Sequence, residues 1–217
     1  MVNSIHKITK TLILLLVFNL LLISSAFAIE NNADAIYRSG GLGNDWDHAG
    51  VYAPNTMVYE IKGINQTVGL YSLSSFKVDA SYTYFGPYYQ SWVDSSTKKQ
   101  YILNTCSALD AAPGLTYTAL GQAYTFGNPG TRVDVADLSD IRCDGVVEYS
   151  YEDNGFYVWG PSDTLTRYGA PWHYLITTPS FLAAHQTLIR DQPWSGISPY
   201  GQRGAMYPTW TMLTKRY

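Results

Sequence analysis

Cysteine and histidine are scarce in this 217-residue chain, which has two cysteines and four histidines. The histidines show neither His-x-His nor His-Glu-x-x-His spacing, so the sequence predicts no metal site. A Gly-x-Ser-x-Gly elbow is missing, which leaves a serine hydrolase without support. The glycines at 40, 41 and 43 lack the Lys-Ser or Lys-Thr of a phosphate-binding loop, and we expect no cofactor. Basic residues are scattered and the net charge is −3, so nucleic acid is not an expected partner.

The N-terminus has the three parts of a secretory signal. Lys7 and Lys10 precede an apolar run, and Ala26-Phe27-Ala28 has the small-x-small pattern of a cleavage site. The apolar run is too short to be a membrane span. We expect residues 1–28 to be removed and residues 29–217 to form one secreted or periplasmic domain, monomeric and with no membrane span.

Residue patterns along the mature chain predict an α+β fold. Residues 48–52 and 57–61 are short β-prone runs around a Pro-Asn turn, which indicates a hairpin. Residues 63–95 are polar and aromatic, and we expect strands and loops there. Residues 98–112 have helical periodicity, with Cys106 on the apolar face. The segment 161–217 alternates short apolar runs with Pro and Gly, and we expect it to complete the sheet and cover it.

A second helix is predicted around the other cysteine. Asp140 is the expected N-cap and Gly155 the expected stop, so Cys143 falls in the first turn. The free N–H groups and positive dipole end of a helix start lower the pKa of a thiol there. Arg142 favours the thiolate and Asp144 opposes it. The sequence therefore predicts Cys143 as a nucleophile.

A nucleophilic cysteine needs an imidazole, and three histidines survive signal removal: His48, His173 and His185. The hairpin favours His48. If its turn closes on Pro54, residues whose numbers sum to 108 pair across it, and Glu60 lies opposite His48. A carboxylate there would bind the ring N–H and steady the imidazolium.

Two details of the predicted hairpin stay open at this point. Asp45 or Asp47 could orient the ring in place of Glu60. Gly50, the next residue on the face of His48, leaves room for the thiol or the substrate.

These residues carry a resemblance to a known family. Arg142-Cys-Asp-Gly-Val-Val-Glu-Tyr149 resembles the Asp-Cys-Ser-Gly-Leu-Val-x-Tyr signature of NlpC-type cysteine hydrolases of the papain-like superfamily, and His48-Ala-Gly-Val-Tyr52 resembles their His-Val-Gly-Ile-Tyr strand. Their third polar residue follows the histidine by twelve positions, where this chain has Glu60. Because His48 precedes Cys143, the order resembles the circularly permuted branch, with YiiX-like proteins and the lecithin retinol acyltransferase group. The resemblance covers roughly residues 36–62 and 115–155.

The resemblance implies a permuted papain-like core: an antiparallel sheet packed against a helix that carries the nucleophile Cys143 at its N-terminus. It also implies acyl transfer through a thioester, with His48 as base, Glu60 as third residue and Tyr117 as a substrate-binding residue. Together with export, it favours amide bonds of cell-wall peptide as substrate. A lipid or fatty-amide acyl hydrolase or transferase is the alternative.

A non-enzymatic interpretation also stays open. An even number of cysteines in an exported chain favours a disulfide, here between Cys106 and Cys143. With 19 tyrosines, a disulfide-closed surface binding protein is then the second alternative.

Overall fold

The computed structural model describes residues 31–40, 43–78, 81–118, 123–125, 134–156, 158–159, 198–205, 208–209 and 211–217. The expected signal peptide, His173 and His185 lie outside these residues. Within the described part of the chain, no helix combines the length and the apolar composition that a bilayer crossing requires.

A six-stranded antiparallel sheet forms one layer, and with the helices packed on it the fold is α+β, as the sequence predicts. The strand order is β4-β3-β2-β1-β5-β9. The strands are β1 (Ala35–Gly40), β2 (Gly43–Ala53), β3 (Met57–Glu60), β4 (Gly69–Ser72), β5 (Tyr84–Gln90) and β9 (Leu213–Lys215). A short helix not expected from the sequence, α2 (Leu73–Lys77), follows β4.

The predicted hairpin is formed by β2 and β3, but its register differs from the expected one. Ala53 pairs with Met57 and Val51 with Tyr59, so paired residues sum to 110 rather than 108. The turn is therefore centred on Asn55, whose φ of 61° is left-handed. Continuing this register brings Glu60 opposite Gly50. Because the shift is two residues, Glu60 and His48 still share one face.

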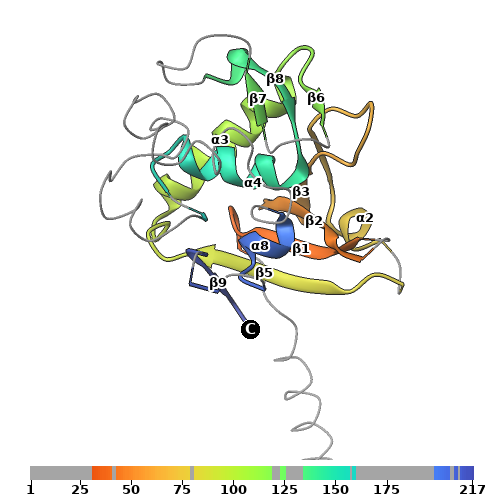
Figure 1. Ribbon diagram of the computed structural model, residues 1–217. Coiled ribbons are helices and arrows are strands. Elements are labelled where there is room, and N and C mark those ends of the chain that lie inside the picture. Colours follow the sequence, from red (N-terminus) through yellow and green to blue (C-terminus); the bar gives the residue numbers. More distant parts are fainter. Residues whose placement is uncertain are drawn as a thin grey trace, which may run out of the picture.

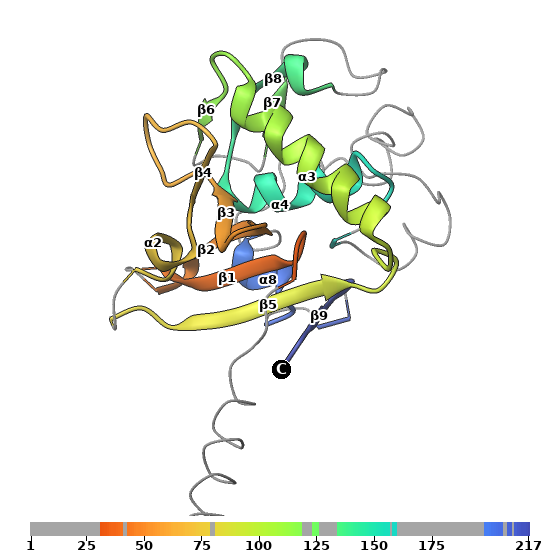
Figure 2. The same cartoon turned by 180° about the vertical axis from the view of Figure 1, so that it is seen from behind.

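A second, three-stranded sheet has the order β6-β8-β7, with β6 (Thr116–Tyr117), β7 (Ala123–Thr125) and β8 (Leu138–Ile141). The 3₁₀ turn η1 (Val135–Asp137) precedes β8. Helix α3 (Ser96–Ala111) matches the predicted helix over 98–112 and begins at the N-cap Ser95. Helix α4 (Cys143–Glu152) lies between the two sheets, as both views show (Figures 1 and 2).

The start of α4 differs from the prediction by two residues. Asp140 belongs to β8, where its carboxylate accepts a hydrogen bond from Thr116 (3.0 Å), and Arg142 is the N-cap. The pairing of β8 with both of its neighbours extends the strand past Asp140. Cys143 is therefore the first residue of the helix. Gly155 lies just beyond the helix end with a φ of 80°, which fits the expected stop.

Buried apolar side chains cover both faces of the large sheet. On one face, residues of β1, β2 and β5 pack against α3 and α4, with Ala49, Val51 and Cys106 in this cluster. On the other face, Tyr52 packs with Val58 and with Phe76 of α2. A third cluster joins α4 to the small sheet and includes Cys143. The side chains of β2 thus alternate between two enclosed faces.

The C-terminal segment completes the sheet, as expected. Strand β9 pairs with β5 at the sheet edge, and Arg216 binds the Asp34 carboxylate through Nε (2.5 Å) and Nη2 (2.8 Å). Helix α8 (Pro199–Gln202) packs against β2 and α4. The C-terminal segment therefore contacts both the edge strand β5 and the strand β2, which carries His48.

Candidate active site

His48 and Glu60 form a direct buried contact. The ring Nε2 of His48 lies 2.6 Å from Oε2 of Glu60, and the residues are 7% and 1% exposed. With Nε2 bound to the carboxylate, Nδ1 is the ring nitrogen left for a substrate or a thiol. Glu60, twelve residues after His48, occupies the position predicted for the third residue. Asp47 is bound instead to Arg203 (3.0 Å).

The space beside Gly50 is already filled. A Cβ built on Gly50 would lie 2.7 Å from Cγ1 of Val58 and 3.1 Å from the Phe76 ring. The expectation that Gly50 leaves room for the thiol or substrate is therefore wrong, because the α2 face of the sheet is itself enclosed. Gly50 instead admits Phe76, whose ring centroid lies 5.4 Å from that of His48 and supports the imidazole.

Cys143 reaches the strand of His48 from the helix start. Its sulfur accepts backbone hydrogen bonds from Ala49, the neighbour of His48, and from Asp144, and these contacts favour the thiolate. Of the hydrogen bonds that the described residues make, none joins the thiol to the imidazole. The start of α4 thus places the sulfur beside the peptide bond between His48 and Ala49, but the thiol and the imidazole are not hydrogen-bonded to each other. Catalytic hydrogen bonds are commonly long in unliganded sites.

Burial dominates the protonation of both groups. Burial, together with the charge of the Asp144 carboxylate, raises the pKa of the Cys143 thiol to about 12. Burial lowers the pKa of His48 below 6.5, although the hydrogen bond and charge of Glu60 act in the opposite direction. The expectation of a thiol with a lowered pKa is therefore wrong for this structure, because the effect of desolvation is larger than that of the helix start. The thiol and the imidazole are both neutral at pH 7.

Arg142 and Asp144, which flank the cysteine, neutralise each other. Nε and Nη2 of Arg142 bind the two oxygens of Asp144 at 2.6 and 2.5 Å, and both side chains are buried. Their opposing effects on the pKa of Cys143 were expected from the sequence. Their pairing was not, although a spacing of two residues at a helix start makes it possible.

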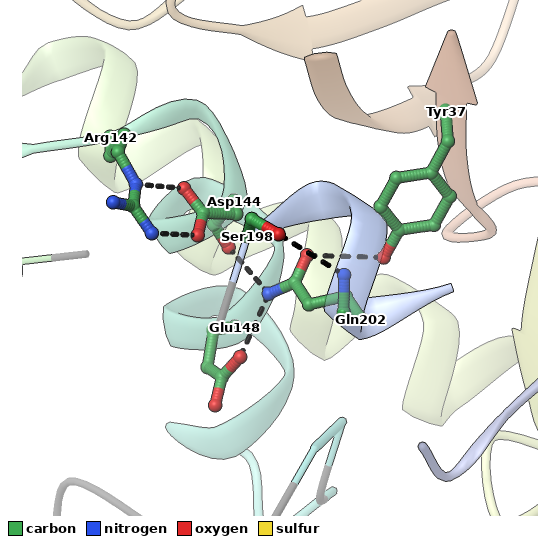
Figure 3. Close-up of polar contacts among 7 residues, drawn as sticks. Tyr37, Arg142, Asp144, Glu148, Ser198 and Gln202 are labelled. Carbon is green, nitrogen blue, oxygen red and sulfur yellow. Dashed lines mark hydrogen bonds and ion pairs between the residues drawn. The ribbon is translucent and has the colours of Figure 1, made fainter. Parts of the chain in front are cut away.

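A network behind the cysteine fixes the first turn of α4 (Figure 3). The amide of Gln202, fully buried in α8, donates to the Asp144 carbonyl oxygen (2.9 Å) and to Oε2 of Glu148 (2.8 Å). Its own oxygen accepts a hydrogen bond from the Tyr37 hydroxyl (3.2 Å). Sequence reasoning missed Gln202 because nothing near it in the chain marks it as part of the site.

Tyr117 lies in β6 of the small sheet, next to the strand that leads into α4. It pairs with Ile141 across β6 and β8, two residues before Cys143. Burial, together with the charges of Cys143 and Asp144, raises the pKa of its phenol to about 12. The phenol is therefore within electrostatic reach of the thiol.

Arg38 is the second residue that the sequence did not reveal. It pairs with His48 across β1 and β2, and its guanidinium lies 5.7 Å from the Phe76 ring centroid and 5.1 Å from that of Tyr82. Burial lowers the pKa of Arg38, while Glu60, Tyr82 and Cys143 raise it. A positive charge thus stands beside the histidine and the cysteine.

Both cysteines are free and buried. Cys106 packs in the cluster between α3 and the large sheet, as its helical pattern predicts, whereas Cys143 belongs to the cluster beside the small sheet. The structure therefore contradicts the disulfide alternative. Within the described residues, no group of three or more His, Cys, Asp or Glu side chains is arranged to hold a metal ion.

Comparisons with known proteins return no matching family model, no matching curated protein and no matching solved structure.

Proposed function

We propose that this chain is an exported cysteine hydrolase of the permuted NlpC type, which cleaves amide bonds of cell-wall peptide through a thioester. The observation that carries the proposal is the buried 2.6 Å contact between His48 and Glu60, set one residue from the backbone amide that Cys143 contacts. Enzymes that transfer acyl groups through a thioester use a thiol nucleophile, an imidazole base and a third group that orients the imidazole. Cys143, His48 and Glu60 are groups of these three kinds.

In the proposed reaction, Nδ1 of neutral His48 takes the thiol proton as the sulfur of Cys143 attacks the amide carbonyl. Because its pKa is lowered, the imidazole is in its basic form at pH 7. Backbone N–H groups at the start of α4 would hold the oxyanion. The imidazolium, stabilised by Glu60, then protonates the leaving amine. Water, deprotonated by the same imidazole, releases the acid from the thioester.

The test compares variants of the mature chain in a Cys106→Ala background, which leaves one thiol. We expect release of soluble peptides with new amino groups from purified peptidoglycan. Cys143→Ala should abolish this release, and His48→Asn should lower it by about 10³-fold or more, since nucleophile and base act together. Glu60→Gln keeps the side-chain shape and should cost about 10–100-fold.

The outcomes separate the alternatives. Release that is unchanged in Cys143→Ala would contradict the proposed chemistry. Hydrolysis of labelled phospholipid in place of peptidoglycan, lost in Cys143→Ala, would keep the mechanism and assign the lipid alternative. The Cys106→Ala chain itself serves as the control, because Cys106 and Cys143 lie in different buried clusters.

A further inference from the structure

We propose that two consecutive residues next to the C-terminus, Gln202 and Arg203, are positioning residues that fix the helix of the nucleophile against the strand of the base. Gln202 binds the residue that follows Cys143, and Arg203 binds the residue that precedes His48. This inference rests on the proposed function and extends its machinery to the segment that carries α8. Gln202 and Arg203 with these contacts are called the α8 clamp below.

The side chain of Gln202 spans one turn of α4 (Figure 3). Its amide nitrogen donates to the carbonyl oxygen of Asp144 (2.9 Å) and to Oε2 of Glu148 (2.8 Å), which lies one turn further along the helix. A carboxamide nitrogen has two N–H groups, so it can serve both acceptors at once. Gln202 is fully buried, and its oxygen accepts a hydrogen bond from the Tyr37 hydroxyl (3.2 Å). The turn of α4 that begins with Cys143 is therefore bound to α8 on its buried side.

The side chain of Arg203 binds the strand of His48. Its Nε and Nη2 both lie 3.0 Å from Oδ2 of Asp47, whose side chain is buried. The guanidinium carbon lies 3.9 Å from the ring centroid of Phe85 and 4.8 Å from that of Tyr200, and the two rings restrict its orientation. The residue before the proposed base is thus fixed to the same segment that binds α4.

The local sequence holds the two clamp residues in place. The Ser198 hydroxyl caps α8 by accepting from the N–H of Gly201 (3.2 Å), and Pro199 occupies the first turn, where its ring fixes the backbone. Because Gln202 and Arg203 are consecutive, their Cα atoms are about 3.8 Å apart and no linker separates them. Helix α8 also packs directly against β2 and α4. One short segment therefore sets the separation of α4 and β2 at the site.

This separation matters for the reaction. The sulfur of Cys143 accepts a hydrogen bond from the backbone amide of Ala49 on β2, so a shift of α4 relative to β2 changes the distance from the sulfur to the His48 ring. A misplacement of about 1 Å in an active site can cost about 100-fold in rate. The α8 clamp should therefore affect kcat, although it contacts the residues beside the reacting groups and not those groups themselves.

The experiment measures kcat and KM in the Cys106→Ala background on soluble peptidoglycan fragments, with kcat expressed per folded molecule from urea titrations. Gln202→Met removes both amide donors and keeps the length of the side chain, and Arg203→Gln breaks the contact with Asp47. Each should lower kcat by about 10–100-fold and leave KM within about threefold. Arg203→Lys keeps the charge but not the planar guanidinium, and it should recover part of kcat.

The matched control is Arg216→Gln, which breaks another arginine–aspartate pair of the C-terminal segment, the one with Asp34. It should lower the free energy of unfolding and keep kcat per folded molecule within about twofold. The double variant of Gln202→Met and Arg203→Gln should lose at most about threefold more kcat than the weaker single variant, because either break releases the same two segments. Independent structural losses would multiply instead.

Three results would overturn the inference and leave the proposed function standing. These are equal losses of kcat in Arg203→Gln and Arg216→Gln, wild-type kcat in both clamp variants, or a raised KM at unchanged kcat, which would assign a substrate contact instead. If Gln202→Met does not fold, the two substitutions of the partly exposed Arg203 decide. If labelled phospholipid is the substrate, the same comparison is made with it.

If the unmodified site turns over neither substrate, the proposed function fails, and the reactivity of the thiol decides about the clamp. Cys143 is buried, and release of its helix turn should open the sulfur to solvent. Labelling by iodoacetamide at pH 9 that is about tenfold faster in Gln202→Met and Arg203→Gln, but not in Arg216→Gln, would support the α8 clamp. Equal labelling rates in these variants and the parent chain would refute it.

Discussion

Reactivity of the Cys143 thiol offers the sharpest test of the site. Its pKa of about 12 reflects burial and the Asp144 carboxylate, whereas a free cysteine has a pKa of about 8.5. At pH 7.5 the thiolate fraction is then about 3,000-fold lower than that of free cysteine. The greater nucleophilicity of a more basic thiolate recovers about 40-fold. We expect iodoacetamide to label Cys143 about 100-fold more slowly than free cysteine.

Asp144→Asn is the perturbation that should reverse this effect. It removes a charge that raises the pKa of Cys143 and releases Arg142, whose charge lowers it, so both changes act in one direction. Each unit by which the pKa falls should accelerate labelling about threefold, after the loss of nucleophilicity is counted. Asp110→Asn removes the same charge from an exposed position on α3 and should leave the rate unchanged.

The assay is mass-resolved labelling of the Cys106→Ala chain between pH 6 and pH 10. With a neutral thiol the logarithm of the rate should rise with pH across this range. A plateau near neutral pH that disappears in His48→Asn would refute the reasoning, since it would reveal a thiolate–imidazolium pair. The wild-type profile decides this even if Asp144→Asn, with Arg142 left unpaired in the interior, does not fold.

Two further predictions concern the packing and the charge around the imidazole. Gly50→Ala should lower the free energy of unfolding by about 1–3 kcal/mol in urea titrations, because its Cβ would lie 2.9 Å from a backbone oxygen. Gly69→Ala is the control, because its Cβ would meet the ring of Tyr71, a side chain that can move. An equal loss of stability in Gly69→Ala would contradict this packing. In proton NMR titrations the pKa of His48 should lie below 6.5, so the free energy of unfolding should decrease as the pH falls below 6.5. Glu60→Gln should lower that pKa further and Arg38→Gln should raise it, and shifts of the same sign would show that the two charges do not flank the ring.

The local pattern determined the elements that hold the candidate site. Two β-prone runs around a Pro-Asn turn predicted the hairpin over residues 48–61. The side-chain period of two kept His48 and Glu60 on one face even though the register moved by two residues. The expected N-cap Asp140 placed Cys143 in the first turn of a helix, and α4 begins at Cys143 itself. These inferences succeeded because each depends on neighbours within a few positions of the chain.

The tertiary structure decided what surrounds those residues. Phe76 fills the space beside Gly50, Gln202 reaches the first turn of α4 from 58 positions away, and Arg38 faces His48 from another strand. No local pattern marks such partners, because they meet only when distant segments pack. Burial, which raises the pKa of Cys143 and lowers that of His48, is likewise a property of everything that covers a side chain. The sequence thus named the candidate groups, and only the packed interior determined their protonation.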